Sequence, residues 1–316
     1  MTHAIRPVDF DNLKTMTYEV TGRIARITFN RPDKGNAIVA DTPLELSALV
    51  ERADLDPNVH VILVSGRGEG FCAGFDLSAY AEGSSSAGSG FSTGSPYRDT
   101  VLSGRTQAVN HLPDQPWDPM IDYQMMSRFV RGFSSLLHCD KPTVVKIHGY
   151  CVAGGTDIAL HADQVIAAAD AKIGYPPTRV WGVPAAGMWA HRLGDQRAKR
   201  LLLTGDCLSG RQAAEWGLAV EAPEPEDLDE RTERLVERIA AVPINQLIMV
   251  KLAMNAALLQ QGVATSRMVS TVFDGIARHT PEGHAFVAES REHGFREAVR
   301  HRDEPFGDHG RRTSGV

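Results

Sequence analysis

The stretch His148-Gly149-Tyr150-Cys151-Val152-Ala153-Gly154-Gly155-Thr156-Asp157 has a counterpart about eighty residues earlier, Gly68-Glu69-Gly70-Phe71-Cys72-Ala73-Gly74-Phe75-Asp76-Leu77. Each glycine-rich stretch follows an apolar run that predicts a buried strand, residues 59–65 before the earlier one and 143–147 before the later one. Each also precedes a candidate helix start. A strand, a glycine turn and a helix start leave unpaired backbone N–H groups at one spot, where the helix dipole favours negative charge.

Two turns of this kind suggest a shared chemical purpose. If they meet in space, their N–H groups hold one developing oxyanion from two sides. This indicates chemistry on an activated carbonyl rather than on phosphate or a metal ion. The sequence shows no P-loop, no Ser-His-Asp order and no His/Cys/Asp cluster that would favour a nucleotidase, a serine hydrolase or a metal enzyme.

The composition of the 316-residue chain is that of an ordinary globular protein, with 42% hydrophobic and 23% charged residues. A formal net charge of -6 argues against nucleic-acid binding. No run approaches the roughly eighteen apolar residues of a membrane span, and the N-terminus lacks a signal-peptide pattern. The cysteines have no CxxC spacing, so we expect free buried thiols in a cytoplasmic protein that binds neither nucleic acid nor membrane; they are Cys72, Cys139, Cys151 and Cys207.

Local patterns divide the chain into three parts. Residues 1–16 form an N-terminal extension, and residues 17–220 form an α/β core with a flexible, glycine- and serine-rich insert near 81–120. Residues 221–316 form a C-terminal helical region, with apolar helices expected at 244–259 and 263–276.

Shorter signals place further elements within the core. Residues 17–30 alternate and turn at Thr21-Gly22-Arg23, which predicts a β-hairpin. Thr42-Pro43-Leu44-Glu45 predicts a capping box that opens a helix running to about Arg52. A further helix is expected near 121–137.

Taken together, several motifs resemble those of the crotonase superfamily, the family of enoyl-CoA hydratases and isomerases. Each motif alone is weakly specific for the family, but the order and spacing of the motifs together are strongly specific for it. They are Asn30-Arg31-Pro32 with Asn36-Ala37, Phe71 to Leu77, Gly149 to Asp157, Leu203 to Asp206, and Ala213 to Leu218, with a looser echo at Glu282 to Phe286.

The resemblance implies an α/β fold of the crotonase type, a spiral of ββα units with a C-terminal helical region used in oligomerisation. It implies a homotrimer or a dimer of trimers. The implied substrate is an acyl-CoA thioester, and no metal or redox cofactor is implied because coenzyme A is part of the substrate.

The resemblance also assigns roles to individual residues. The oxyanion donors would be the backbone N–H groups of Phe75 and Gly154, in agreement with the argument from the glycine turns. Lys34, Ala37 and Ala73 fall where the family holds the nucleotide end of coenzyme A.

Hydratases of this family use two glutamates, one to activate water and one to deliver a proton to the α-carbon. Asp157 stands where the first belongs, three residues after Gly154, and is shorter by a methylene. Its carboxylate would therefore sit about 1–1.5 Å further back, a gap that matters for proton transfer. An aspartate in the first turn of a helix also stabilises the helix dipole without any chemistry.

No carboxylate occupies the expected second position, where the sequence has Pro177 or Thr178. Tyr175, Thr178 and Arg179 are the nearby candidates for orienting water or binding a polar acyl group, and we take Tyr175 and Arg179 as substrate-binding residues. The insert adds four further candidates, His111, Asp118, Asp122 and Tyr123.

The sequence thus predicts an enoyl-CoA hydratase-like lyase that hydrates a 2-enoyl-CoA through an oxyanion-stabilised enolate, with Asp157 as general acid or base. The absent second acid keeps other reactions open: isomerisation, thioester hydrolysis, decarboxylation, or dehydration of a functionalised acyl-CoA. A non-catalytic acyl-CoA-binding protein is the remaining alternative.

Overall fold

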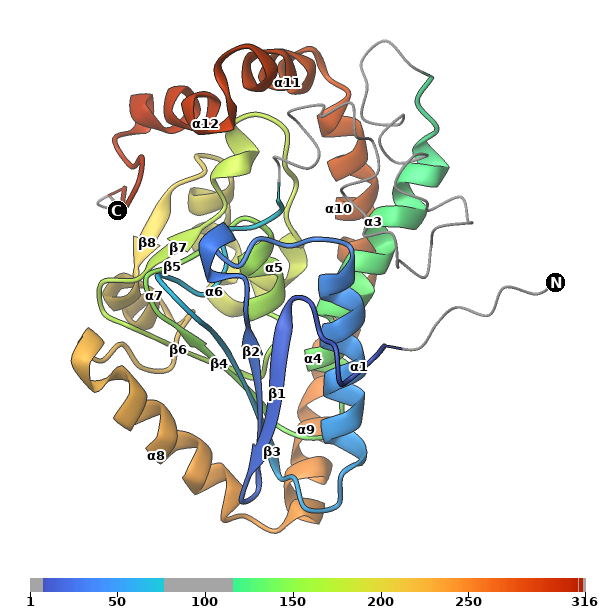
Figure 1. The fold of residues 1–316 in the computed structure, drawn as a ribbon, viewed down its shortest axis with the longest axis vertical. Coiled ribbons are helices and arrows are strands. Elements are labelled where there is room, and N and C mark those ends of the chain that lie inside the picture. Colours follow the sequence, from blue (N-terminus) through green and yellow to red (C-terminus); the bar gives the residue numbers. More distant parts are fainter. Residues whose placement is uncertain (1–7, 77–115, 312, 315–316) are drawn as a thin grey trace, which may run out of the picture.

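The computed structural model describes residues 8–76, 116–311 and 313–314. Two sheets form its centre, with helices packed around them (Figure 1). The larger sheet has the strand order β1-β2-β3-β4-β6 and the smaller one β5-β7-β8. Their bounds are β1 Met16–Thr21, β2 Ile24–Phe29, β3 Val61–Gly66, β4 Thr143–Ile147, β5 Tyr150–Val152, β6 Gln164–Ala167, β7 Lys172–Gly174 and β8 Cys207–Ser209.

The helices before the C-terminal region are interleaved with these strands. They are α1 Asp41–Leu55, α3 Pro119–Phe133, α4 Ser135–His138, α5 Gly154–Ala159, α6 Ala186–Leu202 and α7 Gly210–Trp216. Five helices follow in sequence, α8 Leu228–Ala240, α9 Ile244–Gln260, α10 Val263–Arg278, α11 Pro281–His293 and α12 Phe295–Asp303. Short 3-10 helices are η1 Pro32–Lys34, η2 Pro176–Arg179, η3 Pro225–Asp227 and η4 Glu304–Phe306.

The larger sheet follows from its sequence pattern. The predicted hairpin is confirmed, because β1 pairs antiparallel with β2 around a turn in which Gly22 has φ +60°. Strands β2, β3, β4 and β6 then pair in parallel. Parallel strands covered on both faces read as continuous apolar runs, as in Val61-Ile62-Leu63-Val64.

Helix α1 begins differently from the prediction. It starts at Asp41, and the predicted capping box is wrong. The Glu45 carboxylate instead accepts hydrogen bonds from the backbone N–H groups of Lys14 (2.7 Å) and Thr15 (2.8 Å). Glu45 is buried, and these long-range donors satisfy its carboxylate.

The remaining helix predictions are largely confirmed. The helix expected near 121–137 is present as two pieces, α3 and α4, that meet at Ser134. Helices α9 and α10 match the ranges expected from the apolar pattern to within two residues. The fold class is confirmed as mixed α/β with a C-terminal helical region.

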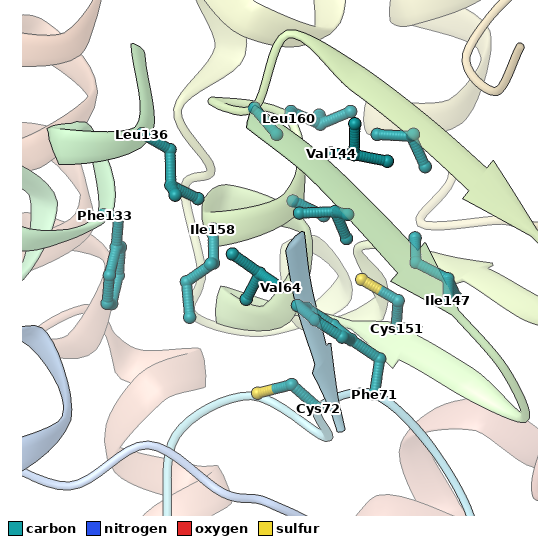
Figure 2. Close-up of a cluster of buried hydrophobic side chains, with 14 of the residues drawn as sticks. Val64, Phe71, Cys72, Phe133, Leu136, Val144, Ile147, Cys151, Ile158 and Leu160 are labelled. Carbon is teal, nitrogen blue, oxygen red and sulfur yellow. The ribbon is translucent and has the colours of Figure 1, made fainter. Parts of the chain in front are cut away.

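One large hydrophobic core joins the sheets to the surrounding helices. Figure 2 shows side chains of β3, β4 and α5, such as Val64, Val144 and Ile158, packed together with Cys72 and Cys151. All four cysteines are free and buried, as expected. Burial raises the pKa of the Cys72 thiol to about 12, so it packs as a neutral group.

No single described helix is long and apolar enough to cross a membrane. The segment 225–240 and α9 pass such a test only as a pair, across a bend of 101°.

Candidate active site

The two glycine-rich turns meet in the structure. Cys72 forms a parallel bridge with Cys151, with Val152 N–H donating to the Cys72 carbonyl at 3.1 Å and Cys72 N–H donating to the Tyr150 carbonyl at 3.2 Å. The turns also approach closely at Gly74, where φ is +94° and a Cβ would lie 2.6 Å from the Ala153 Cβ. Only glycine fits such an approach without forcing the turns apart.

The bridge between Ile38 and Phe75 does not use the Phe75 N–H. Ile38 N–H donates to the Gly74 carbonyl at 2.7 Å, and Asp76 N–H donates to the Ile38 carbonyl at 2.9 Å. This parallel bridge uses the residues on either side of Phe75, so the N–H of Phe75 itself points away from Ile38.

The Gly154 N–H is the first of helix α5 and therefore has no partner within the helix. The preceding residue, Ala153, adopts φ +53° and ψ −130°, a conformation that costs a side-chain-bearing residue on the order of 1–3 kcal/mol. Its N–H is held by the Gly174 carbonyl at 3.0 Å. The packed turns maintain this strained conformation at the start of α5.

A cavity of about 110 Å³ opens beside these donors, and Phe75, Ala153 and Gly154 line it. Helix α3 supplies an apolar wall, which includes Phe129 and Phe133. Phe75 packs against Phe129 with ring centroids 5.2 Å apart. The cavity can therefore hold an apolar group next to an activated carbonyl.

Asp157 lines the same cavity from helix α5. Its Oδ1 accepts a hydrogen bond from the Ala185 N–H at 2.9 Å. Burial raises the pKa of Asp157 to about 7; the Ala185 N–H opposes this rise and the charge of Asp274 adds to it. A carboxyl group that titrates near neutral pH is suited to both accepting and donating a proton.

Tyr175 is buried at the cavity wall, where the sequence placed it. Burial raises its pKa well above the usual value, and the charges of Asp157 and Asp274 act in the same direction. The phenol of Tyr175 therefore stays protonated.

The cavity has a second carboxylate that the sequence did not predict. Asp274, on helix α10, lines the cavity and accepts a hydrogen bond from the Val183 N–H at 3.1 Å. It forms an ion pair with Arg278, one helical turn later, and Arg278 also pairs with Asp122 of α3. The sequence did contain one indication of this pair, because Asp274 and Arg278 lie four residues apart on a largely apolar helix, a spacing that favours an ion pair.

Burial raises the pKa of Asp274, and the adjacent Arg278 opposes the rise. On the far side of Arg278, Asp122 also accepts from Trp117 Nε1 at 3.2 Å. Helices α3 and α10 approach so closely here that a Cβ on Gly275 would lie 2.7 Å from Asp122 Oδ2. Asp122 is thus a structural partner of Arg278 and does not line the cavity.

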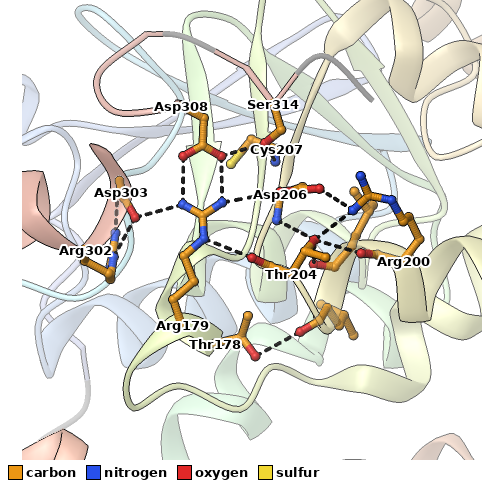
Figure 3. A network of polar contacts seen from close by, with 12 residues as sticks. Thr178, Arg179, Arg200, Thr204, Asp206, Cys207, Arg302, Asp303, Asp308 and Ser314 are labelled. Atoms are coloured by element: carbon orange, nitrogen blue, oxygen red, sulfur yellow. Dashed lines mark hydrogen bonds and ion pairs between the residues drawn. The ribbon is translucent and has the colours of Figure 1, made fainter. Parts of the chain in front are cut away.

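The prediction for Arg179 requires correction. Its side chain is only 2% exposed and does not line the cavity. Figure 3 shows its guanidinium facing Asp303, Asp308 and Asp206, and its Nε donates to the Thr204 carbonyl at 3.0 Å. Bidentate contacts of 2.7 and 2.8 Å join it to Asp308. Because all five N–H donors face oxygen atoms, Arg179 ties the C-terminal segment to the core rather than binding an acyl group.

The three residues predicted to hold coenzyme A lie close to the first turn. Ala73 N–H donates to the Gly35 carbonyl at 3.0 Å, and Ala37 N–H donates to the Lys34 carbonyl at 3.1 Å. Lys34 and Ala73 are exposed and Ala37 is buried. The loop at 34–37 thus runs alongside the turn that carries Phe75.

Two other predicted candidates within the described residues do not line the cavity. Asp118 caps helix α3 by accepting from the N–H groups of Met120 and Ile121, and Tyr123 does not line the cavity. His111 and the residues of the predicted insert up to 115 lie outside the described residues. Within the described part of the chain, no three His, Cys, Asp or Glu side chains gather as metal ligands.

One family model, described as enoyl-CoA hydratase/isomerase, matches residues 19–100 and 119–298. A crystal structure of an enoyl-CoA hydratase from Mycobacterium smegmatis is 83% identical, covers 98% of this chain and all of its own, and superposes with a TM-score of 0.91. An enoyl-CoA hydratase/isomerase structure from Xanthobacter autotrophicus Py2 is 26% identical, covers 93% of this chain and 99% of its own, and has a TM-score of 0.77.

Two curated relatives are also similar to this chain. A Mycobacterium tuberculosis protein named "Probable enoyl-CoA hydratase EchA14" is 31% identical over 64% of this chain, and the match spans 66% of that relative's own length. The (E)-benzylidenesuccinyl-CoA hydratase of Thauera aromatica is 26% identical over 90% of this chain and 99% of its own length.

Proposed function

The chain belongs to the enoyl-CoA hydratase/isomerase family, the crotonase superfamily, and on that premise we propose that it hydrates a 2-enoyl-CoA to a 3-hydroxyacyl-CoA. The observation that carries the proposal is the meeting of the two glycine turns beside a cavity that also contains Asp157. A carbonyl oxygen placed between the Phe75 and Gly154 N–H groups gains stabilisation as negative charge develops on it.

The reaction then follows from the groups at the cavity. The hydroxyl of a water molecule bonds to the β-carbon while the thioester carbonyl takes up the electron pair of the double bond as an enolate. The enolate collapses as its α-carbon receives a proton. We assign proton transfer to Asp157, whose pKa of about 7 lets it exchange a proton at neutral pH.

We further propose that Lys34, Ala37 and Ala73 contact the nucleotide end of coenzyme A, because the loop at 34–37 lies beside the turn that carries Ala73 and Phe75. The hydration changes no net oxidation state, and backbone N–H groups polarise the carbonyl. The proposed reaction therefore requires neither a redox cofactor nor a metal ion.

The proposal is tested by mixing the purified protein with crotonyl-CoA, a longer 2-enoyl-CoA and (E)-benzylidenesuccinyl-CoA. Loss of the conjugated enoyl thioester absorbance, with a 3-hydroxyacyl-CoA identified by mass spectrometry, is the expected result. Binding of these esters without any loss of absorbance would contradict the proposal.

A second candidate is another crotonase-type reaction on a functionalised acyl-CoA, such as thioester hydrolysis, decarboxylation or dehydration. The observation that favours it is that η2 offers no carboxylate where family hydratases have their second acid. A mass-spectrometric product screen across such thioesters distinguishes it from hydration, since each reaction gives a different change in mass.

Gly74→Ala is expected to lower the hydration rate about 100-fold, as loss of one oxyanion donor does. The added methyl group would lie 2.6 Å from the Ala153 Cβ, so the two turns must separate and their N–H groups no longer converge. Gly22→Ala is the matched control, because Gly22 also has positive φ but nothing lies within 4 Å of its added Cβ. Equal turnover of both variants, measured with crotonyl-CoA, would argue against the oxyanion site.

We propose that the chain forms a homo-oligomer through its C-terminal helices, as a homotrimer or a dimer of trimers. Helix α9 is rich in apolar residues, yet only Lys251 and Leu258 are buried within the chain. Lys251 is buried because its ammonium donates to the Leu136 and Lys141 carbonyls at 3.0 and 2.8 Å. A helix that is apolar around most of its circumference is normally covered, and a second copy would cover it.

Light scattering is expected to give a multiple of the 34.4 kDa chain mass. Met254→Glu, on an α9 side chain that is 69% exposed, should reduce the oligomer because it places a charge in the interface. Leu203→Glu is the control, since Leu203 is 81% exposed outside α9 and α10. A wild-type mass of one chain would contradict the proposal.

A further inference from the structure

The cavity holds two carboxyl groups that come from distant parts of the chain. Asp157 is on α5 in the core, and Asp274 is on α10 in the C-terminal helical region. Both line the same cavity, together with the Gly154 and Phe75 turns. The loop after β7 has no acid at the expected position, but α10 brings a second carboxylate to the cavity.

One short loop holds both carboxyl groups in place. The Val183 N–H donates to Asp274 at 3.1 Å, and the Ala185 N–H donates to Asp157 at 2.9 Å. Two residues of extended chain span at most about 7 Å, so the two donor nitrogens lie within that distance of each other. Residues 183 and 185 also line the cavity, which places both carboxyl groups at the same end of it.

The surroundings of the two carboxyl groups differ. Asp274 has Arg278 as an ion-pair partner on its own helix, and this cation favours the carboxylate form. No described cation forms an ion pair with Asp157, which is buried and accepts one backbone hydrogen bond. Two carboxyl groups in such different environments are suited to opposite roles in one reaction, one as base and one as acid.

The charged groups that face Asp274 come from several elements. Arg278 lies beside it on α10, and Asp122 of α3 contacts the other side of Arg278. Tyr175 and Asp157 line the same cavity from the core, and the Asp274 charge raises the pKa of both. A second cation of α10, Arg267, also lines the cavity.

We propose that Asp274 is the second carboxylate of the hydration reaction, in place of the acid missing after β7. The Asp274 carboxylate accepts a proton from the water whose oxygen bonds to the β-carbon, and the Asp157 carboxyl group donates its proton to the α-carbon. The cycle closes when one proton passes from Asp274 to Asp157. This inference rests on the proposed function.

The test compares Asp274→Asn with Asp122→Asn in the full-length protein. Both variants remove one carboxylate from Arg278, but only the first removes a carboxylate from the cavity. Asp274→Asn is expected to lower kcat about 100-fold with the KM for crotonyl-CoA little changed. Asp122→Asn is expected to retain most of the activity, and thermal melting shows whether the two variants are destabilised to a similar extent.

The pH profile supplies a second readout, because a base at Asp274 makes wild-type kcat fall as the pH drops through the pKa of that carboxyl group, and Asp274→Asn should lack this acidic fall. If Asp157 donates its proton, wild-type kcat falls as the pH rises above about 7. Removing the Asp274 charge removes one cause of the raised pKa of Asp157, so this fall should begin at a lower pH in Asp274→Asn. Asp274→Glu, which keeps a carboxylate, should retain more activity than Asp274→Asn.

Two outcomes overturn the inference while the proposed function stands. One is full activity of Asp274→Asn together with an inactive Asp157→Asn. The other is an equal loss of kcat in Asp274→Asn and Asp122→Asn with unchanged pH profiles, which assigns Asp274 a structural role. A wild-type protein that hydrates none of the three enoyl-CoA esters overturns the proposed function and this inference together.

Discussion

Asp157→Asn is expected to lower the hydration rate by a factor of about 100 to 10,000 while the affinity for acyl-CoA changes little. Asparagine has nearly the same shape, and its amide oxygen still accepts the Ala185 hydrogen bond now made at 2.9 Å. What is lost is a group that exchanges protons near neutral pH. Turnover is measured from the enoyl absorbance and affinity by calorimetry with a saturated acyl-CoA.

The same substitution is expected to stabilise the fold at neutral and alkaline pH. The pKa of Asp157 is about 7 in the folded protein and about 3.9 in the unfolded chain. The stability that the neutral carboxyl group contributes is therefore fully present below about pH 3.9 and is lost as the pH rises to about 7. Three pKa units correspond to about 4 kcal/mol. Asparagine avoids this penalty, although its NH₂ group needs a partner in the cavity.

Melting temperatures of the wild type and Asp157→Asn should therefore diverge at pH 8 and converge toward pH 4. Asp229→Asn serves as a control, because Asp229 is an exposed carboxylate paired with Lys146. Unchanged turnover of Asp157→Asn would remove Asp157 from the mechanism. A melting difference independent of pH would contradict the raised pKa.

Arg179→Met is expected to destabilise the protein by about 3–5 kcal/mol, the usual effect of removing one partner from a buried ion pair. Asp308 is fully buried, and each of its carboxylate oxygens accepts a hydrogen bond from Arg179. The substitution removes both hydrogen bonds and the positive charge beside this carboxylate. Asp303 keeps a contact with Arg302, so the main loss falls on Asp308 (Figure 3). Denaturant unfolding measures the change in free energy.

Arg200→Met is the control for this prediction. Arg200 pairs with Asp206 in the same network, but its side chain is 46% exposed, and exposed ion pairs contribute about 0–1 kcal/mol. Acyl-CoA affinity should survive in Arg179→Met molecules that remain folded. A loss of affinity without a loss of stability would restore the predicted binding role of Arg179.

Local sequence patterns predicted much of this protein because they act over short distances. The apolar runs before each glycine turn became β3 and β4, and the apolar periods of the C-terminal region became α9 and α10. The glycines at 74 and 154 predicted that two turns could meet, and the contact between them confirms it. In each case the pattern constrains the backbone itself, through periodicity or through the need for a residue without a side chain.

Side chains whose partners lie far along the chain were not predictable in this way. Glu45 looked like a helix cap and instead binds the backbone at residues 14 and 15. Arg179 looked like a pocket residue because it lies in the loop where the second acid is expected, yet two of its partners, Asp303 and Asp308, lie more than a hundred residues later. A long charged side chain takes the direction in which its charge is best compensated, and sequence spacing does not reveal that direction.

The sequence by itself thus determined the two turns and Asp157, which depend on residues close together in the chain, and the family resemblance, which depends on the order and spacing of short motifs along it. Only the tertiary structure decided which carboxylates share the cavity, because helix α10 brings Asp274 to the loop that also holds Asp157. The physical reason is that packing of α10 against α3 and α6 is a property of the whole core, whereas a turn or a helix start is a property of a few neighbouring residues.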